Sequence, residues 1–243
     1  MKMIEPYTDV AYVYDFLLRH VDYQEWYDYI VSVMNRYIDR PENIVELGCG
    51  TGRFGTKFSN SGYTIYGIDK SINMLRVAKT RAFMNFRILG ADITNFQLAK
   101  KMDFIFSVHD TVNYLLEYAD ILNMFRCVRE IMHDTSVFMF DITTEHNIYK
   151  NFNGQTARHQ IQSSTVEWSN RYDAVRKLVS STIVIKKQKK TVVEEHVQRI
   201  YSSDEISELL RESGLVLIDM FGDYTFLPPV DDTIMINFVA RKC

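Results

Sequence analysis

The sequence predicts an α/β fold with a mainly parallel sheet of seven strands that ends in an antiparallel hairpin, and with an antiparallel β-meander inserted before the last helix. Short apolar runs alternate with segments of helical periodicity, which is typical of a parallel sheet covered on both faces. The first run leads into three glycines at alternate positions, Gly48, Gly50 and Gly52. With 243 residues, 47% of them hydrophobic, the chain can bury one substantial core, and we expect a single domain over residues 1–243.

The strands of the sheet are predicted from the apolar runs and the helices from the segments between them. Two helices are expected over residues 71–81 and 120–132. Ser202 and Glu205 form a capping box that opens a last helix, and Gly214 ends it. The predicted strands are residues 44–47, 63–68, 86–89, 103–108, 137–142, 215–220 and 233–240.

Residues 155–201 form an insertion with a different pattern. They lack helical periodicity and contain three extended runs, 155–169, 177–187 and 191–201. Turns are expected at residues 170–173 and at Lys189-Lys190, which predicts an antiparallel meander between the fifth strand and the last helix.

Residues 1–38 are predicted to form an N-terminal helical lid. This segment is rich in tyrosine, including Tyr14 and Tyr23. Asp22 and Glu25 predict a helix that begins near Tyr23. A carboxylate at the N-cap accepts hydrogen bonds from the first free backbone N–H groups of a helix.

The glycine turn indicates a ligand of nucleotide-like shape. Glycine is needed where the backbone takes positive φ or where a ligand approaches it closely. The dinucleotide fingerprint requires a small residue at the position of Arg53, so a nicotinamide-dependent oxidoreductase is disfavoured. The Gly-Lys-Ser/Thr of a phosphate-binding P-loop is also missing. A ligand without phosphate fits this turn better.

Two acidic residues follow the glycine turn at sequence separations that indicate which ligand it binds. Asp69 closes the second predicted strand, close to the ~20 residues expected between a glycine turn and the acid that accepts a ribose diol. Asp92 follows the third predicted strand, where it can accept a hydrogen bond from an adenine amine. Each acid alone is better explained as a strand-end or helix-capping residue, but the spacing of both from the turn favours ligand binding.

Composition narrows the class of protein further. The net charge of −3 and the isoelectric point near 6.1 give no electrostatic footprint for nucleic acid. We expect no membrane span and no signal peptide. Cys49, Cys127 and Cys243 are too widely spaced for a disulfide framework or a zinc site, so we expect no metal and a cytoplasmic protein. A monomer or a homodimer is expected.

The pattern Glu46-x-Gly48-x-Gly50-x-Gly52 resembles the first motif of class I S-adenosylmethionine-dependent methyltransferases, and the resemblance covers about residues 40–243. It implies a Rossmann-like sheet and S-adenosyl-L-methionine as cofactor, with S-adenosyl-L-homocysteine as product. The residues that it implies for cofactor binding are Tyr14, Tyr23, Glu46, Leu47, Gly48, Cys49, Gly50, Gly52, Asp69, Lys70, Met74, Ala91, Asp92, Ile93 and Val108.

A narrower resemblance comes from Tyr14-Asp15, Asp22-Tyr23 and His196-x-x-Arg199-x-Tyr201. With these motifs, its N-terminal helices and its meander, the chain resembles small-molecule methyltransferases such as glycine N-methyltransferases and nucleotide-activated amino-sugar N,N-dimethyltransferases. The chain departs from the amino-sugar enzymes at Tyr114, where those enzymes tend to have His.

Candidate catalytic and acceptor residues follow from this placement. His109 lies just past the fourth predicted strand and is the first candidate base for an amine nucleophile, with Tyr114 and His196 behind it, and Tyr14 is expected beside the reacting methyl group. The residues predicted to bind the acceptor are Trp168, His196, Arg199 and Tyr201. Strand alternation puts His196 and Arg199 on opposite faces, so only one of them can face a pocket, and Arg199 is the chosen anchor for a carboxylate or phosphate.

The function predicted from these features is direct SN2 transfer of a methyl group to a small molecule, most readily at an amine nitrogen. Two alternatives remain open, a non-catalytic cofactor-binding regulatory protein and a methyltransferase that acts on RNA or protein. The Asn/Asp-Pro-Pro-aromatic motif of enzymes that methylate amide or base nitrogens is missing after the fourth strand, which reads Ser107-Val108-His109-Asp110. We expect a small-molecule partner and no nucleic acid.

Overall fold

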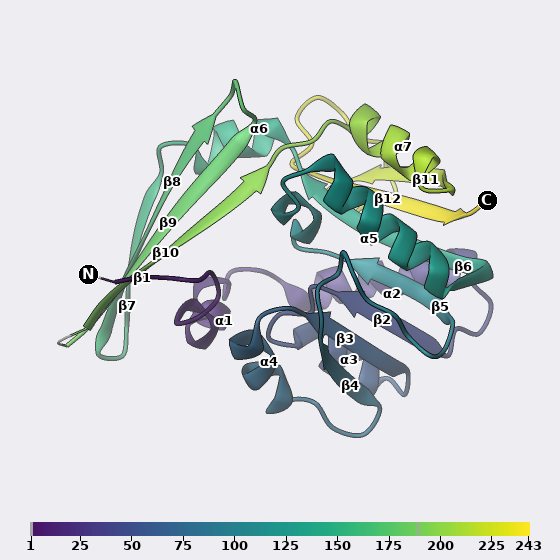
Figure 1. The fold of residues 1–243 in the computed structure, drawn as a ribbon, viewed down its shortest axis with the longest axis horizontal. Helices are drawn as coiled ribbons and strands as arrows, with labels where there is room; N and C mark the ends of the chain where they lie inside the picture. Colours follow the sequence, from purple (N-terminus) through teal and green to yellow (C-terminus); the bar gives the residue numbers. More distant parts are fainter. Residues whose placement is uncertain (1, 189) are drawn as a thin grey trace.

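The computed structural model describes residues 2–188 and 190–243 and contains two sheets (Figure 1). The larger sheet has seven strands in the order β11-β12-β6-β5-β2-β3-β4. Its first five strands along the chain run parallel, and β12 pairs antiparallel with both β6 and β11. The strands are β2 (Asn43–Leu47), β3 (Thr64–Asp69), β4 (Phe86–Gly90), β5 (Met102–Ser107), β6 (Met132–Thr143), β11 (Leu215–Gly222) and β12 (Met235–Lys242). The predicted Rossmann-like sheet with its final hairpin is confirmed.

Helices cover both faces of this sheet because successive side chains of each strand point to opposite sides. Val45 and Ile105 pack on one face with helices α5 (Tyr118–Ile131) and α7 (Ser203–Glu212). Ile44 and Phe104 pack on the other face with α2 (Tyr23–Tyr37) and α3 (Arg53–Asn60). Helix α4 (Ile72–Lys79) follows β3 and contacts β4.

The caps predicted for two of these helices are present. Asp22 accepts hydrogen bonds from the backbone N–H groups of Gln24 and Glu25 at the start of α2. Ser202 and Glu205 form the capping box of α7. No helix of the described residues is long and apolar enough to cross a membrane.

The second sheet has five strands in the order β1-β10-β9-β8-β7. Four of them form an antiparallel meander, β7 (Thr156–Ile161), β8 (Ser164–Asp173), β9 (Leu178–Lys187) and β10 (Lys190–Arg199). The fifth is the N-terminal strand β1 (Lys2–Ile4), which pairs parallel with β10 and was not predicted. The short helices η1 (Val10–Tyr12) and α1 (Tyr14–Leu17) follow it. Figure 1 shows α1 between the meander and α4.

The meander differs from the prediction in its turns. The predicted run 155–169 is divided by a turn at Gln162, so the meander has four strands and not three. Residues 170–173, predicted as a turn, pair with β9 as part of β8, and the chain turns at residues 174–177. Lys189 of the other predicted turn lies outside the described residues.

The remaining short elements connect the two sheets. They are η2 (Thr111–Tyr114), after β5, and α6 (Glu145–Asn147) with η3 (Ile148–Phe152), between β6 and β7. The loop of η2 contacts both β6 and β10. This loop, which follows the carboxyl end of β5, is therefore where the larger sheet meets strand β10 of the meander.

Candidate active site

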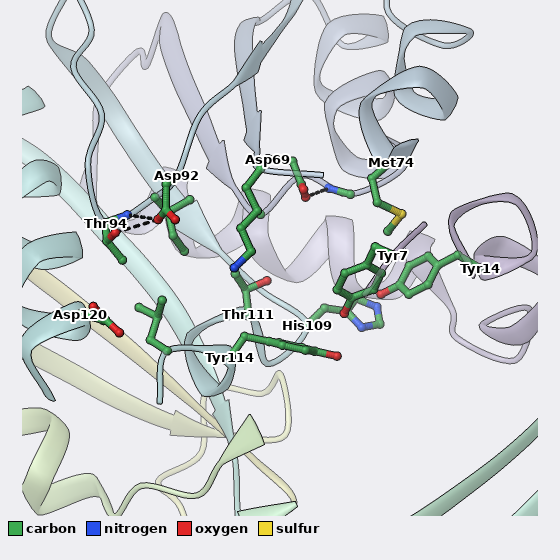
Figure 2. Close-up of a pocket in the computed structure, with 15 residues that line it drawn as sticks. Tyr7, Tyr14, Asp69, Met74, Asp92, Thr94, His109, Thr111, Tyr114 and Asp120 are labelled. Carbon is green, nitrogen blue, oxygen red and sulfur yellow. Dashed lines mark hydrogen bonds between the residues drawn. The ribbon is translucent and has the colours of Figure 1, made fainter. Parts of the chain in front are cut away.

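A cavity of about 210 Å³, the smaller cavity, opens beside the glycine turn (Figure 2). Gly48 and Gly50 form part of its wall and have φ of +76° and +51°. A Cβ at Gly48 would come within 2.5 Å of Thr111 Cγ2, and one at Gly50 would come within 3.3 Å of Met74 Cε. Glycine is therefore required at residue 48 both for the backbone conformation and for the space beside the cavity.

Two carboxylates from neighbouring strand ends face the smaller cavity. Asp69 accepts hydrogen bonds from the backbone N–H groups of Gly50 at 2.9 Å and Ser71 at 2.8 Å, one on each oxygen. Burial nevertheless raises the pKa of Asp69. Asp92 accepts from the backbone N–H and the hydroxyl of Thr94, at 2.9 and 2.7 Å. Partial burial acts to raise the pKa of Asp92, but these hydrogen bonds and the charge of Lys70 outweigh it and lower the pKa.

A second, larger cavity of about 570 Å³ lies between the meander, α2 and the loop after β5. Trp168, Ser181, Ile183, His196 and Gln198 of the meander line it. We call this the larger cavity. The two cavities share four lining side chains, Tyr7, Tyr14, His109 and Tyr114.

We call these four residues the common wall, and in it the rings of Tyr14 and Tyr114 both pack against that of Tyr7. The ring of Tyr7 lies 5.9 Å from that of Tyr14 and 5.7 Å from that of Tyr114. Burial is the main reason that the pKa values of Tyr7, Tyr14 and Tyr114 are raised. The three hydroxyls are therefore protonated at neutral pH and can donate hydrogen bonds.

His109 is fixed by aromatic neighbours from α2. Its ring centroid lies 5.5 Å from that of Tyr23 and 4.5 Å from that of Trp26. Nε2 is buried and has no hydrogen-bond partner among the described residues. Burial, with the charges of His20 and Arg53, lowers the pKa of His109 to about 4, so the imidazole is neutral at neutral pH.

The backbone at His109 and Asp110 takes an uncommon conformation that Asp141 stabilises. Both residues have positive φ, 64° and 49°. The buried Asp141 carboxylate accepts hydrogen bonds from both backbone N–H groups, at 2.9 Å from His109 and 2.7 Å from Asp110. The hydroxyl of Tyr224 also donates to Asp141. Burial raises the pKa of Asp141 to about 7 and that of Asp110 to about 6.

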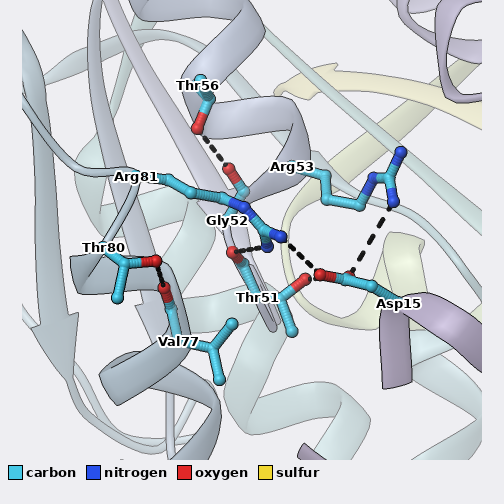
Figure 3. Close-up of polar contacts among 8 residues, drawn as sticks. All are labelled: Asp15, Thr51, Gly52, Arg53, Thr56, Val77, Thr80 and Arg81. Atoms are coloured by element: carbon cyan, nitrogen blue, oxygen red, sulfur yellow. Dashed lines mark hydrogen bonds and ion pairs between the residues drawn. The ribbon is translucent and has the colours of Figure 1, made fainter. Parts of the chain in front are cut away.

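The N-terminal segment is tied to the glycine turn by an ionic cluster (Figure 3). Asp15 of α1 accepts hydrogen bonds from the Thr51 hydroxyl at 2.8 Å and from the Arg81 guanidinium, which also donates to the Thr51 carbonyl at 2.8 Å. Arg53 lies 4.0 Å from the same carboxylate. The segment is tied to the meander as well, because the Glu194 carboxylate accepts from the backbone N–H groups of Asp9 and Val10.

The structure brings about half of the residues predicted for cofactor binding into the walls of the smaller cavity. Those that line it are Tyr14, Gly48, Gly50, Asp69, Lys70, Met74, Asp92 and Ile93. The others do not line it and are Tyr23, Glu46, Leu47, Cys49, Gly52, Ala91 and Val108. Glu46, for example, is buried below the turn, and burial raises its pKa well above the usual value.

Two of the four residues predicted to bind the acceptor line a cavity, and two do not. Trp168 and His196 line the larger cavity, whereas Arg199 and Tyr201 line neither cavity. Arg199 donates to the Leu116 carbonyl at 3.1 Å, with its guanidinium over the ring of Tyr118, and the buried Tyr201 donates to the Leu115 carbonyl. Successive side chains of β10 point to opposite faces, as predicted, and the face that lines the larger cavity is the one with His196 and Gln198.

Several lining residues were not predicted from the sequence. They are Tyr7, Thr94, Leu115 and Asp120 in the smaller cavity, and residues such as Trp26 and Gln198 in the larger cavity. The clustering of tyrosines before residue 38 is the only signal for Tyr7.

The smaller cavity fits a nucleoside ligand with an attached amino-acid group. Its wall has glycines where a Cβ would intrude, two carboxylates that retain acceptor capacity, and the apolar side chains of Met74 and Ile93. A carboxylate accepts hydrogen bonds from ribose hydroxyls or an adenine amine. The lining residues therefore match what S-adenosylmethionine requires.

Comparison with known proteins agrees with this chemistry. Residues 44–135 match the family model described as a methyltransferase domain. The chain is similar to a protein of Geobacillus sp. (strain WCH70) that is named as a methyltransferase, with 23% identity over 97% of this chain and 99% of the relative.

Solved structures share the fold. An S-adenosylmethionine-dependent methyltransferase from Clostridium acetobutylicum ATCC 824 matches with a TM-score of 0.84 and 24% identity, over 97% of this chain and 98% of that chain. The sugar N-methyltransferase KedS8 from Streptoalloteichus sp ATCC 53650 matches with a TM-score of 0.77 and 13% identity, over 95% and 93%. The chain is therefore a methyltransferase with the class I fold, and residues 44–135 are the part of it that matches the family model.

Proposed function

We propose that this methyltransferase acts on a small-molecule amine that binds in the larger cavity. The observation that carries the proposal is the common wall, because Tyr7, Tyr14, His109 and Tyr114 line the smaller and the larger cavity at once. A methyl donor in the smaller cavity and a nucleophile in the larger cavity would therefore lie against the same four side chains. Methyl transfer requires such alignment and the exclusion of water more than it requires acid-base groups.

The cofactor supplies an electrophilic methyl group on a positively charged sulfur. Asp69 and Asp92 hold its nucleoside end, and Gly48 and Gly50 let it approach the backbone. When bound, the cofactor would supply its methyl group to the amine nitrogen, the electron pair of the carbon–sulfur bond would stay on sulfur, and the positive charge would move to nitrogen.

The common wall orients the nucleophile. The neutral His109 imidazole has an unpartnered Nε2 that can accept a hydrogen bond from the amine N–H. Tyr14 and Tyr114 offer hydroxyl donors and aromatic faces, which attract a cation. Trp168 and His196 of the meander contact the body of the acceptor, and we assign no acceptor contact to Arg199 or Tyr201.

A small acceptor is favoured over a polymer. The meander and the N-terminal segment supply many of the lining residues of the larger cavity, and they would obstruct an extended chain. The protein also has a net charge of −3, which gives no attraction to RNA. KedS8, which shares the fold, is a sugar N-methyltransferase, and the proposal places this chain among enzymes with small acceptors. We expect it to act in the cytoplasm as a monomer or homodimer.

The test is a fractionated transfer assay. The protein is incubated with cofactor that carries a labelled methyl group and, in separate reactions, with a metabolite extract, total RNA and total protein. We expect label in the metabolite fraction, on a compound whose mass rises by one methyl group. Label only in RNA or protein would overturn the proposal. Tight cofactor binding without label in any fraction would indicate a regulatory protein.

A further inference from the structure

The larger cavity contains carboxylates without matching cations. Asp22, Glu25 and Asp110 line it, and none of its described lining residues is Lys or Arg. The other polar side chains that line it are the imidazoles of His20, His109 and His196, the hydroxyls of Tyr7, Tyr14, Tyr114, Thr143 and Ser181, and the amides of Asn147, Asn151 and Gln198. Phosphate and carboxylate groups of ligands are usually held by Arg or Lys. The described lining of this cavity has neither Lys nor Arg, and its three carboxylates favour a cation over an anion.

Asp110 directly follows His109 of the common wall, and its charge acts on the other three residues of that wall. One of its oxygens accepts a hydrogen bond from the Gln198 side chain at 2.6 Å, and the other has no hydrogen-bond partner among the described residues. The backbone of Asp110 is held by Asp141. The carboxylate is thus fixed on one side and open to the larger cavity on the other.

The surroundings of Asp110 explain why it suits a cation. The titratable groups that face it are Tyr7, Tyr14, Tyr114, Asp141 and Tyr224. All five are neutral or anionic near neutral pH, so none of them neutralises an ionised Asp110. An ammonium group is a strong partner for a partly buried carboxylate, and the aromatic rings of the common wall add cation–π attraction.

We propose that the larger cavity selects a protonated amine without phosphate or carboxylate groups, and that Asp110 binds the nitrogen and accepts its proton before methyl transfer. This inference rests on the proposed function. In the proton transfer, the ammonium N–H bond breaks, the proton moves to the open Asp110 oxygen, and the electron pair remains on nitrogen as the nucleophile. A nucleotide-activated sugar is disfavoured, because the described residues that line the cavity offer its diphosphate neither Lys nor Arg.

The selectivity is tested by direct binding to the full-length protein saturated with S-adenosylhomocysteine. The probes are 2-phenylethylamine, 2-phenylethanol, 3-phenylpropionate and thymidine diphosphate, measured by NMR titration. We expect the amine to bind about tenfold more tightly than the alcohol, and the two anions to bind least. Tighter binding of either anion than of the amine would overturn the inference. This ranking of the four probes is measured on the wild-type protein alone.

The role of Asp110 is tested with Asp110→Asn, which keeps the shape and is tolerated at positive φ. We expect affinity for 2-phenylethylamine to fall about tenfold, to that for the alcohol, and affinity for S-adenosylhomocysteine to stay within about twofold. The control is Asp232→Asn, the same change at an exposed residue. Unchanged amine affinity in Asp110→Asn would contradict the assignment.

The proton transfer is tested by the pH dependence of methyl transfer to the acceptor found in the fractionated assay. The kcat/KM of the wild type should rise as the pH increases through about 6, and Asp110→Asn should lack this rise. A rise that persists in the variant would remove Asp110 as proton acceptor. A labelled metabolite that carries phosphate would overturn the inference and leave the proposed function intact, whereas label in macromolecules alone would overturn the proposed function.

Discussion

The Asp141 carboxylate accepts a hydrogen bond from the backbone N–H of Asp110 at 2.7 Å and so stabilises a left-handed backbone conformation at the common wall. The same carboxylate accepts from the N–H of His109. A side chain of β6 thereby sets the direction of two residues that line the larger cavity. Asp141 itself lines neither cavity, so its contribution is to position residues that do.

The burial of Asp141 predicts a specific pH dependence of stability. Its pKa is about 7 in the folded protein, above the ordinary value of 3.8. Stability from this group is therefore fully present below about pH 4 and is lost as the pH rises through about 7, because ionisation in the folded state is unfavourable. We expect the unfolding free energy of the wild type, minus that of Asp141→Asn, to decrease over this interval.

Urea unfolding at several pH values measures this difference. Each unit between the folded and unfolded pKa values corresponds to about 1.4 kcal/mol. Asp231→Asn, a change at an exposed carboxylate, serves as the control and should track the wild type. Parallel curves for the wild type and Asp141→Asn would show that Asp141 has an ordinary pKa in the folded state.

Asp69 is predicted to contribute to cofactor affinity. Its oxygens accept the N–H groups of Gly50 and Ser71 and retain capacity for two ribose hydroxyls. Asp69→Ala should weaken S-adenosylhomocysteine binding by roughly 1–3 kcal/mol in calorimetry, through lost charge-assisted hydrogen bonds. Unchanged affinity, or preferential binding of NAD, would refute this role.

The N-terminal segment is predicted to close over the bound cofactor. Asp15 joins it to the glycine turn through Thr51 and Arg81, and Tyr7 and Tyr14 belong to the common wall. Saturating S-adenosylhomocysteine should slow hydrogen exchange in residues 2–30, and Asp15→Ala should reduce that protection. Asp28→Asn, on exposed surface of α2, should behave as wild type. Equal exchange with and without ligand in the wild-type segment would reject the lid.

The meander should contribute to acceptor affinity through one face of β10 and its neighbours. Trp168→Ala removes an aromatic wall of the larger cavity and should raise the KM for the acceptor about tenfold. Arg199→Lys keeps the charge, changes a residue outside both cavities and should leave this KM within about twofold. The opposite ranking in steady-state kinetics would restore Arg199 as the substrate anchor.

The parts of the site that the sequence predicts are those with local signals. Gly48, Gly50 and Asp69 follow buried strands at set spacings, and parallel strands place their carboxyl ends together. The relationship between Asp110 and Asp141 has no such signal, because the two residues meet through strand pairing of β5 with β6. Asp110 is not glycine, so its positive φ could not be predicted from its type.

The meander shows a second limit of local patterns. Asn170 and Asp173 favour turns in sequence but pair within β8, because the partner strand β9 satisfies their backbone groups. The chain instead turns at residues 174–177, and it turns once more at Gln162, which has φ of 53° and is not a typical turn residue. The cavity-facing side of β10 also depended on how the meander packs against the loop after β5, which strand alternation alone does not determine.

Methyl transfer at the common wall is the central claim, and single-turnover kinetics of a His109→Ala, Tyr114→Phe double variant tests it most directly. With saturating cofactor and the acceptor from the fractionated assay, we expect the transfer rate to fall at least about a hundredfold, while affinity for S-adenosylhomocysteine falls less than about tenfold. Transfer at the wild-type rate in a folded double variant would contradict the account and remove both residues from the mechanism.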